Sequence, residues 1–234
     1  MFAYSSDIGA DASWPVETTR RMNRMYRRQR HIYDATRRYY LLGRDRLIAN
    51  LRPEMGTTVL EIGCGTGRNL VTAAGLYPEV RFFGIDVSTE MLTSAISSIS
   101  RHGLENQIRV AHGDAAAFDP QPLFGIQRFD HVLVSYSLSM IPNWRQVLES
   151  AATRLKPGGR LHIVDFGNQQ QMPAMARALL RRWLALFDVT PRDELESVLA
   201  AMADQTGADL QFERLLRDYS QYAVLTLPRE PRKP

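Results

Sequence analysis

The chain has 234 residues, of which 44% are hydrophobic and 23% are charged, with a formal net charge of +4. This composition excludes global disorder, and the length fits one domain with a sizeable core or two small domains. The single cysteine, Cys64, excludes an internal disulfide framework and favours a reducing compartment. No stretch approaches the roughly 20 apolar residues of a membrane-spanning helix, and the first residues do not resemble a secretory signal. We therefore expect a cytoplasmic protein.

The basic residues are concentrated near the N-terminus. Between Arg20 and Arg46 there are ten arginines and only two acids, so the remainder of the chain is slightly acidic. A concentrated basic segment indicates an anionic partner, either lipid headgroups or nucleic acid. The alternative is a helix face that is only solvated.

The same segment has a helical pattern from about Glu17 to Ile48. Tyr26, Tyr33 and Tyr40 are spaced seven residues apart, so they share one face of such a helix. A tyrosine row can be core packing or an aromatic wall for a cationic group. We expect residues 1–50 to form a helical extension and residues 51–234 to form the main domain.

Strand and helix patterns alternate through the middle of the chain. Buried strands are expected over residues 57–62, 80–86, 108–112, 129–135 and 161–166. Helices should begin near Gly67, after an N-cap at Ser88 and near Asn143, and the last should end at the stop signal of residues 155–159. This alternation predicts a doubly wound α/β fold: a parallel sheet with helices on both faces and ligands at the carboxyl ends of its strands.

The C-terminal third has a different pattern. Two helices are expected over residues 173–186 and 193–206, and two strands over residues 208–216 and 219–227. Only Arg217 and Asp218 separate these strands, so they should form a hairpin that adds an antiparallel strand to the sheet.

A glycine-rich turn follows the first expected strand. Its residues 61–67 read Glu-Ile-Gly-Cys-Gly-Thr-Gly. A dinucleotide fingerprint, G-x-G-x-x-G, would place its third glycine at Arg68, whereas this turn has glycines at positions 63, 65 and 67. An acid at the strand end also suits a cationic ligand better than a pyrophosphate.

Two further acids stand at expected strand ends. Asp86 closes the second strand, where a carboxylate can accept hydrogen bonds from both hydroxyls of a ribose. Asp114 follows the third strand and could accept from an adenine amino group. A helix cap or a turn is the alternative role for each acid taken alone.

These motifs together resemble class I S-adenosylmethionine-dependent methyltransferases. The motifs are Glu-Ile-Gly-Cys-Gly-Thr-Gly at 61–67, Gly-Ile-Asp at 84–86, Gly-Asp-Ala at 113–115 and Leu-Lys-Pro-Gly-Gly at 155–159. The resemblance implies a Rossmann-like seven-stranded sheet with an antiparallel last strand. It also implies a site for S-adenosylmethionine, with S-adenosylhomocysteine as product. The cofactor-binding residues would be Glu61, Gly63, Cys64, Gly65, Thr66, Gly67, Asn69, Asp86, Val87, Met91, Asp114, Ala115 and Ser135.

Residues 22–46 and 136–144 resemble a narrower group, the bacterial betaine-lipid N-methyltransferases. The specific parts are R-x-I-Y-D-x-T-R at 30–37 and Y-Y-L-L-G-R-D-R-L-I at 39–48. This resemblance implies that the amino group of diacylglyceryl-homoserine is methylated three times at an anionic membrane surface, with the homoserine-lipid-forming enzyme as a partner. Tyr33 and Tyr136 would be catalytic, and the substrate would contact Tyr26, Tyr33, Tyr40, Arg44 and Tyr136.

Two other functions remain open at this point. One is methylation of a soluble small molecule, with the basic helix acting only as a lid. The other is a nucleic-acid-binding protein with a methyltransferase-like fold, although no N-P-P-Y-like motif follows the fourth strand. The five histidines are scattered, so no metal site is expected. We expect no nucleic-acid partner and a peripheral location at the inner face of the membrane.

Overall fold

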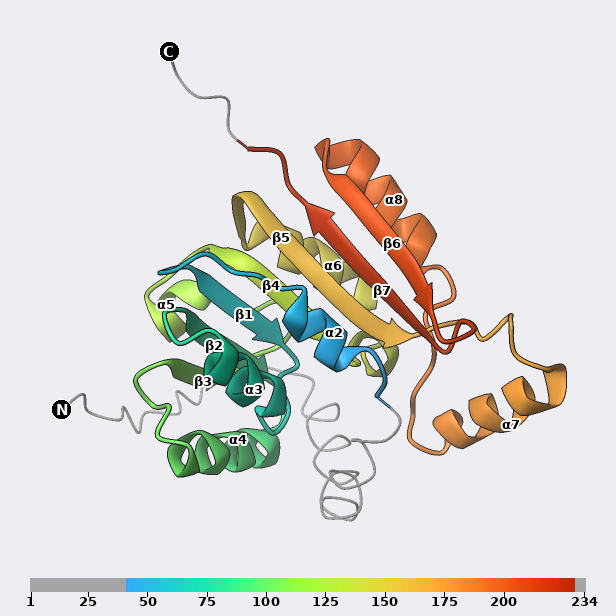
Figure 1. The fold of residues 1–234 in the computed structure, drawn as a ribbon, viewed down its shortest axis with the longest axis horizontal. Coiled ribbons are helices and arrows are strands. Elements are labelled where there is room, and N and C mark those ends of the chain that lie inside the picture. Colours follow the sequence, from blue (N-terminus) through green and yellow to red (C-terminus); the bar gives the residue numbers. More distant parts are fainter. Residues whose placement is uncertain (1–40, 230–234) are drawn as a thin grey trace.

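The computed structural model describes residues 41–229, which fold around a seven-stranded sheet (Figure 1). The strand order is β3-β2-β1-β4-β5-β7-β6. β7 runs antiparallel to both of its neighbours, β5 and β6, and the other pairs are parallel. The predicted α/β fold with an antiparallel last strand is therefore confirmed. The strands are β1 (Thr58–Ile62), β2 (Arg81–Asp86), β3 (Ile108–His112), β4 (Phe129–Ser135), β5 (Leu155–Phe166), β6 (Asp209–Leu215) and β7 (Ser220–Thr226).

Helices cover both faces of this sheet. On one face lie α2 (Arg44–Ala49), α3 (Arg68–Leu76) and α4 (Thr89–Arg101) (Figure 1). On the other face lie α5 (Pro120–Phe124), α6 (Trp144–Thr153) and α8 (Leu195–Thr206). α7 (Ala174–Ala185) follows β5 and stands apart from both groups, and a short 3₁₀ helix, η1 (Leu138–Met140), follows β4. No helix within residues 41–229 is long and apolar enough to cross a membrane.

The central strands are apolar because both faces of the sheet are covered. In β4, Val132 and Val134 join the core beneath α6, whereas Leu133 joins the core beneath α3. Successive side chains of a strand point to opposite faces, so a doubly covered strand shows a continuous apolar run. The sequence run of β4 predicted its bounds for this reason.

The expected continuous helix over residues 17–48 is wrong at residues 41–43, which are not helical, whereas residues 44–48 are helical as predicted. α2 begins at Arg44, and Gly43 before it has a φ of 94°, in the left-handed region. A Cβ at Gly43 would lie 3.2 Å from both Leu215 Cδ1 and Val164 Cγ2, so a glycine lets the chain cross close to β5 and β6. Tyr26, Tyr33 and Tyr40 lie outside the described residues.

Two other boundaries differ from the sequence-based prediction. α6 ends at Thr153, but β5 starts at Leu155 and includes the glycine pair that was expected to end the helix and precede the strand. A Cβ at Gly159 would lie 2.8 Å from Lys156 O and 3.0 Å from Asp130 O, so this part of β5 bends closely over its own backbone. The connection between β6 and β7 spans residues 216–219 rather than two residues, and three of them have positive φ.

Candidate functional site

The carboxyl ends of β1 and β2 meet at the glycine-rich turn. Gly63, Gly65 and Gly67 all have positive φ, at 72°, 55° and 75°. The amides of Gly63 and Cys64 both donate to Ile85 O at 2.9 Å, which holds the turn against β2. A Cβ at Gly63 would lie 2.7 Å from the Cβ of Ser137 in the segment after β4. The turn therefore requires glycine for its backbone conformation and, at position 63, also for its closeness to a neighbour.

Asp86 connects this turn to the start of α4. Its Oδ2 accepts from the Gly65 amide at 2.8 Å, and its Oδ1 accepts from the Ser88 amide at 2.9 Å. Ser88 in turn caps α4 as predicted, since its Oγ accepts from the Met91 amide at 3.3 Å. A carboxylate has about four acceptor positions, so Asp86 can hold the backbone and also accept from ligand hydroxyls.

Glu61 is a buried carboxylate at the end of β1. Its Oε1 accepts from Asn69 Nδ2 at 2.7 Å, and its Oε2 has no hydrogen-bond partner among the described residues. Burial raises the pKa of Glu61 to about 8, although the Asn69 hydrogen bond and the positive charge of Arg44 oppose this rise. A buried acceptor without a partner is costly, so this oxygen fits a site whose ligand carries a donor or a positive charge.

The ends of β2 and β3 lie side by side, because Asp86 pairs with His112 in the sheet. Asp114 Oδ1 accepts from the Ala116 amide at 2.8 Å, which orders the turn after β3. Val87 and Ala115 are half-buried, and Met91 is buried in the first turn of α4. The expected residues of the adenine side therefore occupy neighbouring ends of two strands.

The remaining residues of the expected cofactor site differ in their surroundings. Cys64 is buried and lies so close to β2 that a Cβ at Gly84 would be 2.8 Å from its Sγ. Thr66 is half-buried within the turn. Ser135 ends β4, and its buried Oγ has no hydrogen-bond partner in the described part of the chain.

Of the residues expected to contact the acceptor, the structure describes Arg44 and Tyr136. Tyr136 is buried, has a φ of 54°, and donates its hydroxyl proton to Leu42 O. Its ring meets that of Phe166 edge-on, with centroids 4.7 Å apart. Burial raises the pKa of the Tyr136 hydroxyl, whereas the charge of Arg44 lowers it. Arg44 thus acts electrostatically on both Glu61 and Tyr136, and the roles of these two residues toward an acceptor stay predictions.

Sequence reasoning missed a buried polar cluster beside the β4 end. Asp165, which is fully buried in β5, accepts from the Ser139 amide at 3.1 Å and from the Phe166 amide at 2.7 Å. Arg192 donates from Nε to Leu138 O at 2.9 Å and from Nη2 to Ile141 O at 2.8 Å. Together they fix the segment of residues 138–141, which directly follows Ser137, the neighbour of Gly63. Burial raises the pKa of Asp165 to about 6. The sequence feature that could have indicated this cluster is the aspartate near the end of a predicted strand, in Ile-Val-Asp-Phe at residues 163–166.

Residues 41–229 contain no group of three or more His, Cys, Asp or Glu side chains that could hold a metal ion. The site described above is instead a set of backbone amides, glycines and carboxylates at the carboxyl ends of parallel strands. In doubly wound folds this edge is where ligands bind.

A family model described as a methyltransferase domain matches residues 53–221, which is more than half of the chain. The chain belongs to this methyltransferase-domain family. The match contains the glycine turn, Asp86, Asp114 and the cluster around Asp165.

Curated proteins similar to this methyltransferase domain include a demethylmenaquinone methyltransferase of Listeria monocytogenes, 32% identical over 116 residues. That alignment covers 49% of this chain and 47% of the relative. The O-methyltransferase cnsE of Penicillium expansum is 29% identical over 151 residues, covering 64% of this chain and 52% of the relative. The chain thus spans about half the length of these relatives.

Solved structures share the fold at low sequence identity. Phosphoethanolamine N-methyltransferase 2 of Haemonchus contortus, solved with S-adenosyl-L-methionine, has a TM-score of 0.64 at 17% identity. The match covers 80% of this chain and 52% of the Haemonchus contortus chain. The YcgJ protein of Bacillus subtilis has a TM-score of 0.62 at 17% identity and covers 81% of this chain, with 99% of its own chain covered. These similarities confirm the fold of the methyltransferase domain.

Proposed function

We propose that this methyltransferase domain binds S-adenosylmethionine at the turn between β1 and α3 and transfers its methyl group to an amine. The observation that carries the proposal is the buried Glu61 Oε2, which has no hydrogen-bond partner within residues 41–229, beside three left-handed glycines. S-adenosylmethionine carries an α-ammonium group and a sulfonium, so a carboxylate there matches its charge. When bound, the cofactor supplies an electrophilic methyl group.

Each part of the cofactor has a matching group in this site. The acidic end of β1 suits the methionine ammonium, the half-buried carboxylate at the end of β2 suits the ribose hydroxyls, and the ends of β2 and β3 suit the adenine. The Ser135 hydroxyl at the end of β4 is the group that we expect to face the transferred methyl group. The assigned residues are Glu61, Asp86, Val87, Met91, Asp114, Ala115 and Ser135.

The proposed acceptor is the amino group of diacylglyceryl-homoserine, which three transfers would convert to a betaine lipid. The sequence resemblance over residues 22–46 and 136–144 supports this choice. Arg44 lies near Glu61 and Tyr136 and could pair with the homoserine carboxylate, because guanidinium and carboxylate groups form paired hydrogen bonds. The basic segment supports a peripheral location at the cytoplasmic face of an anionic membrane, near the enzyme that forms the homoserine lipid.

Methyl transfer from a sulfonium is an in-line displacement, so this chain mainly has to position the amine, exclude water and let the amine lose its proton. The Tyr136 hydroxyl already donates to Leu42 O, and its pKa is raised by burial. In this arrangement it suits positioning of the acceptor better than removal of a proton. Tyr33 or water would then accept the proton from the ammonium.

Calorimetry with S-adenosylmethionine tests the cofactor site. Asp86→Ala should weaken binding by roughly 1.5–3 kcal/mol, because charge-assisted hydrogen bonds to the ribose are lost. The matched control is Asp209→Ala, which removes an exposed carboxylate from β6 at the far edge of the sheet. Equal affinity of the Asp86→Ala variant and the wild type would remove Asp86 from the proposed site.

Lipid extraction tests the acceptor. The chain is expressed in a host without betaine lipids, with and without the enzyme that forms the homoserine lipid, and the lipids are analysed by mass spectrometry. Mono-, di- and trimethylated homoserine lipids are expected only when both proteins are present. The purified chain is also offered a demethylated quinol, because demethylmenaquinone methyltransferases are among its relatives. Methylation of the quinol without methylation of the amino lipid would contradict the proposed acceptor.

A further inference from the structure

α7 has an exposed apolar face that is not covered by the rest of the described chain. Met175, Leu179 and Leu186 are 77%, 64% and 72% exposed, and they account for three of the eight exposed large hydrophobic residues within residues 41–229. With Arg182 they occupy positions spaced four, three and four residues apart, so they line one side of the helix and its C-cap. Exposed apolar side chains gathered on one helix face mark an interaction site.

On the opposite side of α7, one residue near the end of the helix anchors it to the core that contains Tyr136. Leu184 is 1% exposed and belongs to the same apolar core as Tyr136 and Phe166. Trp183 and Phe187 lie half-buried on the flank, with ring centroids 5.1 Å apart. The apolar outer face therefore points away from the site, on a helix that borders it.

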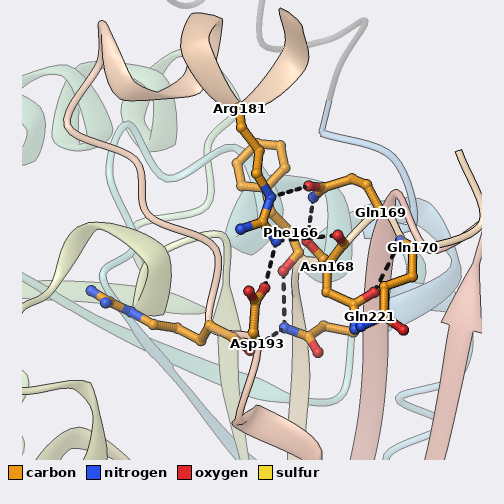
Figure 2. A network of polar contacts seen from close by, with 9 residues as sticks. Phe166, Asn168, Gln169, Gln170, Arg181, Asp193 and Gln221 are labelled. Atoms are coloured by element: carbon orange, nitrogen blue, oxygen red, sulfur yellow. Dashed lines mark hydrogen bonds and ion pairs between the residues drawn. The ribbon is translucent and has the colours of Figure 1, made fainter. Parts of the chain in front are cut away.

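A polar network fixes the orientation of α7 (Figure 2). Arg181 donates from Nε to Gln169 Oε1 at 3.0 Å, and from Nη2 to Asn168 O at 3.1 Å and to Asp193 Oδ1 at 2.7 Å. Gln169 is fully buried, and its backbone amide donates to Asp218 O at 3.0 Å. Figure 2 shows the Arg181 side chain reaching from α7 toward the loop that follows β5. These hydrogen bonds hold α7, and with it the outer apolar face, in a defined orientation.

The charge of α7 indicates which partner its face suits. The helix carries Arg177, Arg181 and Arg182 and no acid, and no acid occurs between Asp165 and Asp188. Arg182 is exposed and stands within the apolar row, where a long side chain can keep its guanidinium among headgroups while its stem contacts acyl chains. A helix with an apolar face, arginines and flanking aromatic rings is typical of helices that lie in a membrane interface.

We propose that the outer face of α7, formed by Met175, Leu179, Arg182 and Leu186, docks on an anionic bilayer. The purpose of this docking rests on the proposed function, because docking there would bring the acceptor edge of the sheet to a lipid substrate. The docking itself needs neither cofactor nor methyl transfer. A second copy of the chain, or another segment of the same chain, is the competing occupant of this face.

Vesicle sedimentation tests the docking. The full chain is mixed with vesicles of equal parts phosphatidylglycerol and phosphatidylcholine, which contain no amino lipid, or with phosphatidylcholine alone. The wild type should bind the anionic vesicles, and Leu179→Ser/Leu186→Ser should lower its partition coefficient by about tenfold or more, because two apolar contacts are lost. The control, Met55→Ser/Leu76→Ser, removes two equally exposed apolar residues far from α7 and should stay within about twofold of the wild type.

A fluorescent label distinguishes the possible occupants. Cys64 is buried, so a polarity-sensitive dye can be attached selectively at Leu179→Cys. Docking predicts a spectrum typical of water in the free protein and a blue shift when anionic vesicles are added. A blue-shifted spectrum without vesicles that does not change on their addition would mean that the face is already covered by protein. That result, or wild-type vesicle binding by Leu179→Ser/Leu186→Ser, overturns the proposal.

Activity measurements keep this test separate from the proposed function. The Leu179→Ser/Leu186→Ser variant should bind S-adenosylmethionine like the wild type, because neither residue belongs to the glycine turn. Its methyl transfer to the homoserine lipid should fall about tenfold on bilayers and less than about twofold in detergent micelles. Absence of methyl transfer by the wild type would contradict the proposed acceptor, whereas vesicle binding would still be measured by sedimentation.

Discussion

Gly63 combines a left-handed backbone conformation with a very close neighbouring side chain. Its φ is 72°, and a Cβ there would also lie 2.7 Å from Ser137 Cβ. Gly56 has almost the same φ, 75°, but a Cβ there would meet nothing within 4 Å. The two positions therefore separate the cost of backbone strain from the cost of a clash with the segment after β4.

We expect Gly63→Ala to destabilise the fold more than Gly56→Ala. Backbone strain should cost about 1–3 kcal/mol at either position, and the clash at Gly63 should add about 1–3 kcal/mol. Urea unfolding measures the difference between the two variants. Gly63→Ala should also abolish cofactor binding in calorimetry, whereas Gly56→Ala should not. Equal loss of stability in both variants would show that the segment around Ser137 yields easily.

Glu61 predicts a pH dependence of cofactor binding. Its pKa is raised to about 8 by burial, so the free protein holds this carboxyl protonated at neutral pH. A cationic ligand prefers the ionised carboxylate, so binding should release a proton, and affinity should rise with pH by up to about tenfold per unit below the pKa.

Calorimetry between pH 5.5 and 7.5, in buffers of different ionisation enthalpy, measures that proton release. Glu61→Gln keeps the Asn69 neighbour and the shape of the side chain but removes the titration, so its affinity should be lower and nearly flat with pH. A wild-type affinity that does not change over this range would contradict the contact between Glu61 and the ammonium group.

At the scale of single elements, Ser88 shows how a helix start and a ligand site depend on each other. Its Oγ caps α4, while its amide donates to Asp86, the residue assigned to the ribose. Ser88→Ala should cost about 1 kcal/mol of stability through the lost cap. Ser94→Ala, which changes a serine inside the same helix, should stay within about 0.5 kcal/mol of the wild type.

Chemical denaturation of the two serine variants provides the comparison. Ser88→Ala should also weaken cofactor binding more than Ser94→Ala does, because the position of the Asp86 carboxylate depends on the start of α4. If both variants bind and unfold alike, the cap contributes nothing to this site.

The sequence predicted elements best where one local rule dominated. β3 and β4 match their expected bounds because their apolar runs are continuous, and the cap of α4 follows from a serine before an apolar helix face. α5 was missed although Asp119 caps it and Pro120 occupies its first turn, because it has only five residues. The early start of β5 was missed because its glycine pair is typical of a loop, whereas in the structure it forms backbone hydrogen bonds with Leu227 and Pro228, which follow β7.

Part of the candidate site could be predicted from the order of the strands. The glycine turn, Asp86 and Asp114 each stand at the end of a predicted strand, so the fold itself brings them close together. Asp165 and Arg192 are 27 positions apart (192 − 165) and meet only through the tertiary structure, as do Gln169 and Arg181 across the start of α7. No local sequence pattern predicts such contacts.

At the scale of the whole molecule, two buried histidines in β4 and β5 link stability to pH. His131 Nδ1 and His162 Nε2 are 3.2 Å apart, and burial lowers their pKa values to about 4 and about 3. Between pH 6.5 and about 4 the unfolded chain binds more protons at these histidines than the folded chain. The free energy of unfolding therefore keeps the full contribution of these buried neutral histidines above pH 6.5 and loses it as the pH falls toward 4.

Urea unfolding at pH 7 and pH 5 tests this link. The His131→Leu/His162→Leu variant should lose less stability on acidification than the wild type, by on the order of 1 kcal/mol for each histidine. His102→Gln changes an exposed histidine of the α4 C-cap and should leave the acid sensitivity unchanged. Equal acid sensitivity in the double variant and the wild type would assign the effect to other groups.

The strand order also governs how the chain is made. β5 lies between β4 and β7, and β7 is formed by residues 220–226, so one side of β5 stays without its partner until Thr226 has left the ribosome. During that interval one side of this twelve-residue strand presents open amides and carbonyls to any neighbouring chain. Nascent chains that stall between β5 and β7 should therefore be bound by chaperones or aggregate, and translation through the last helices should be a sensitive stage in producing this protein.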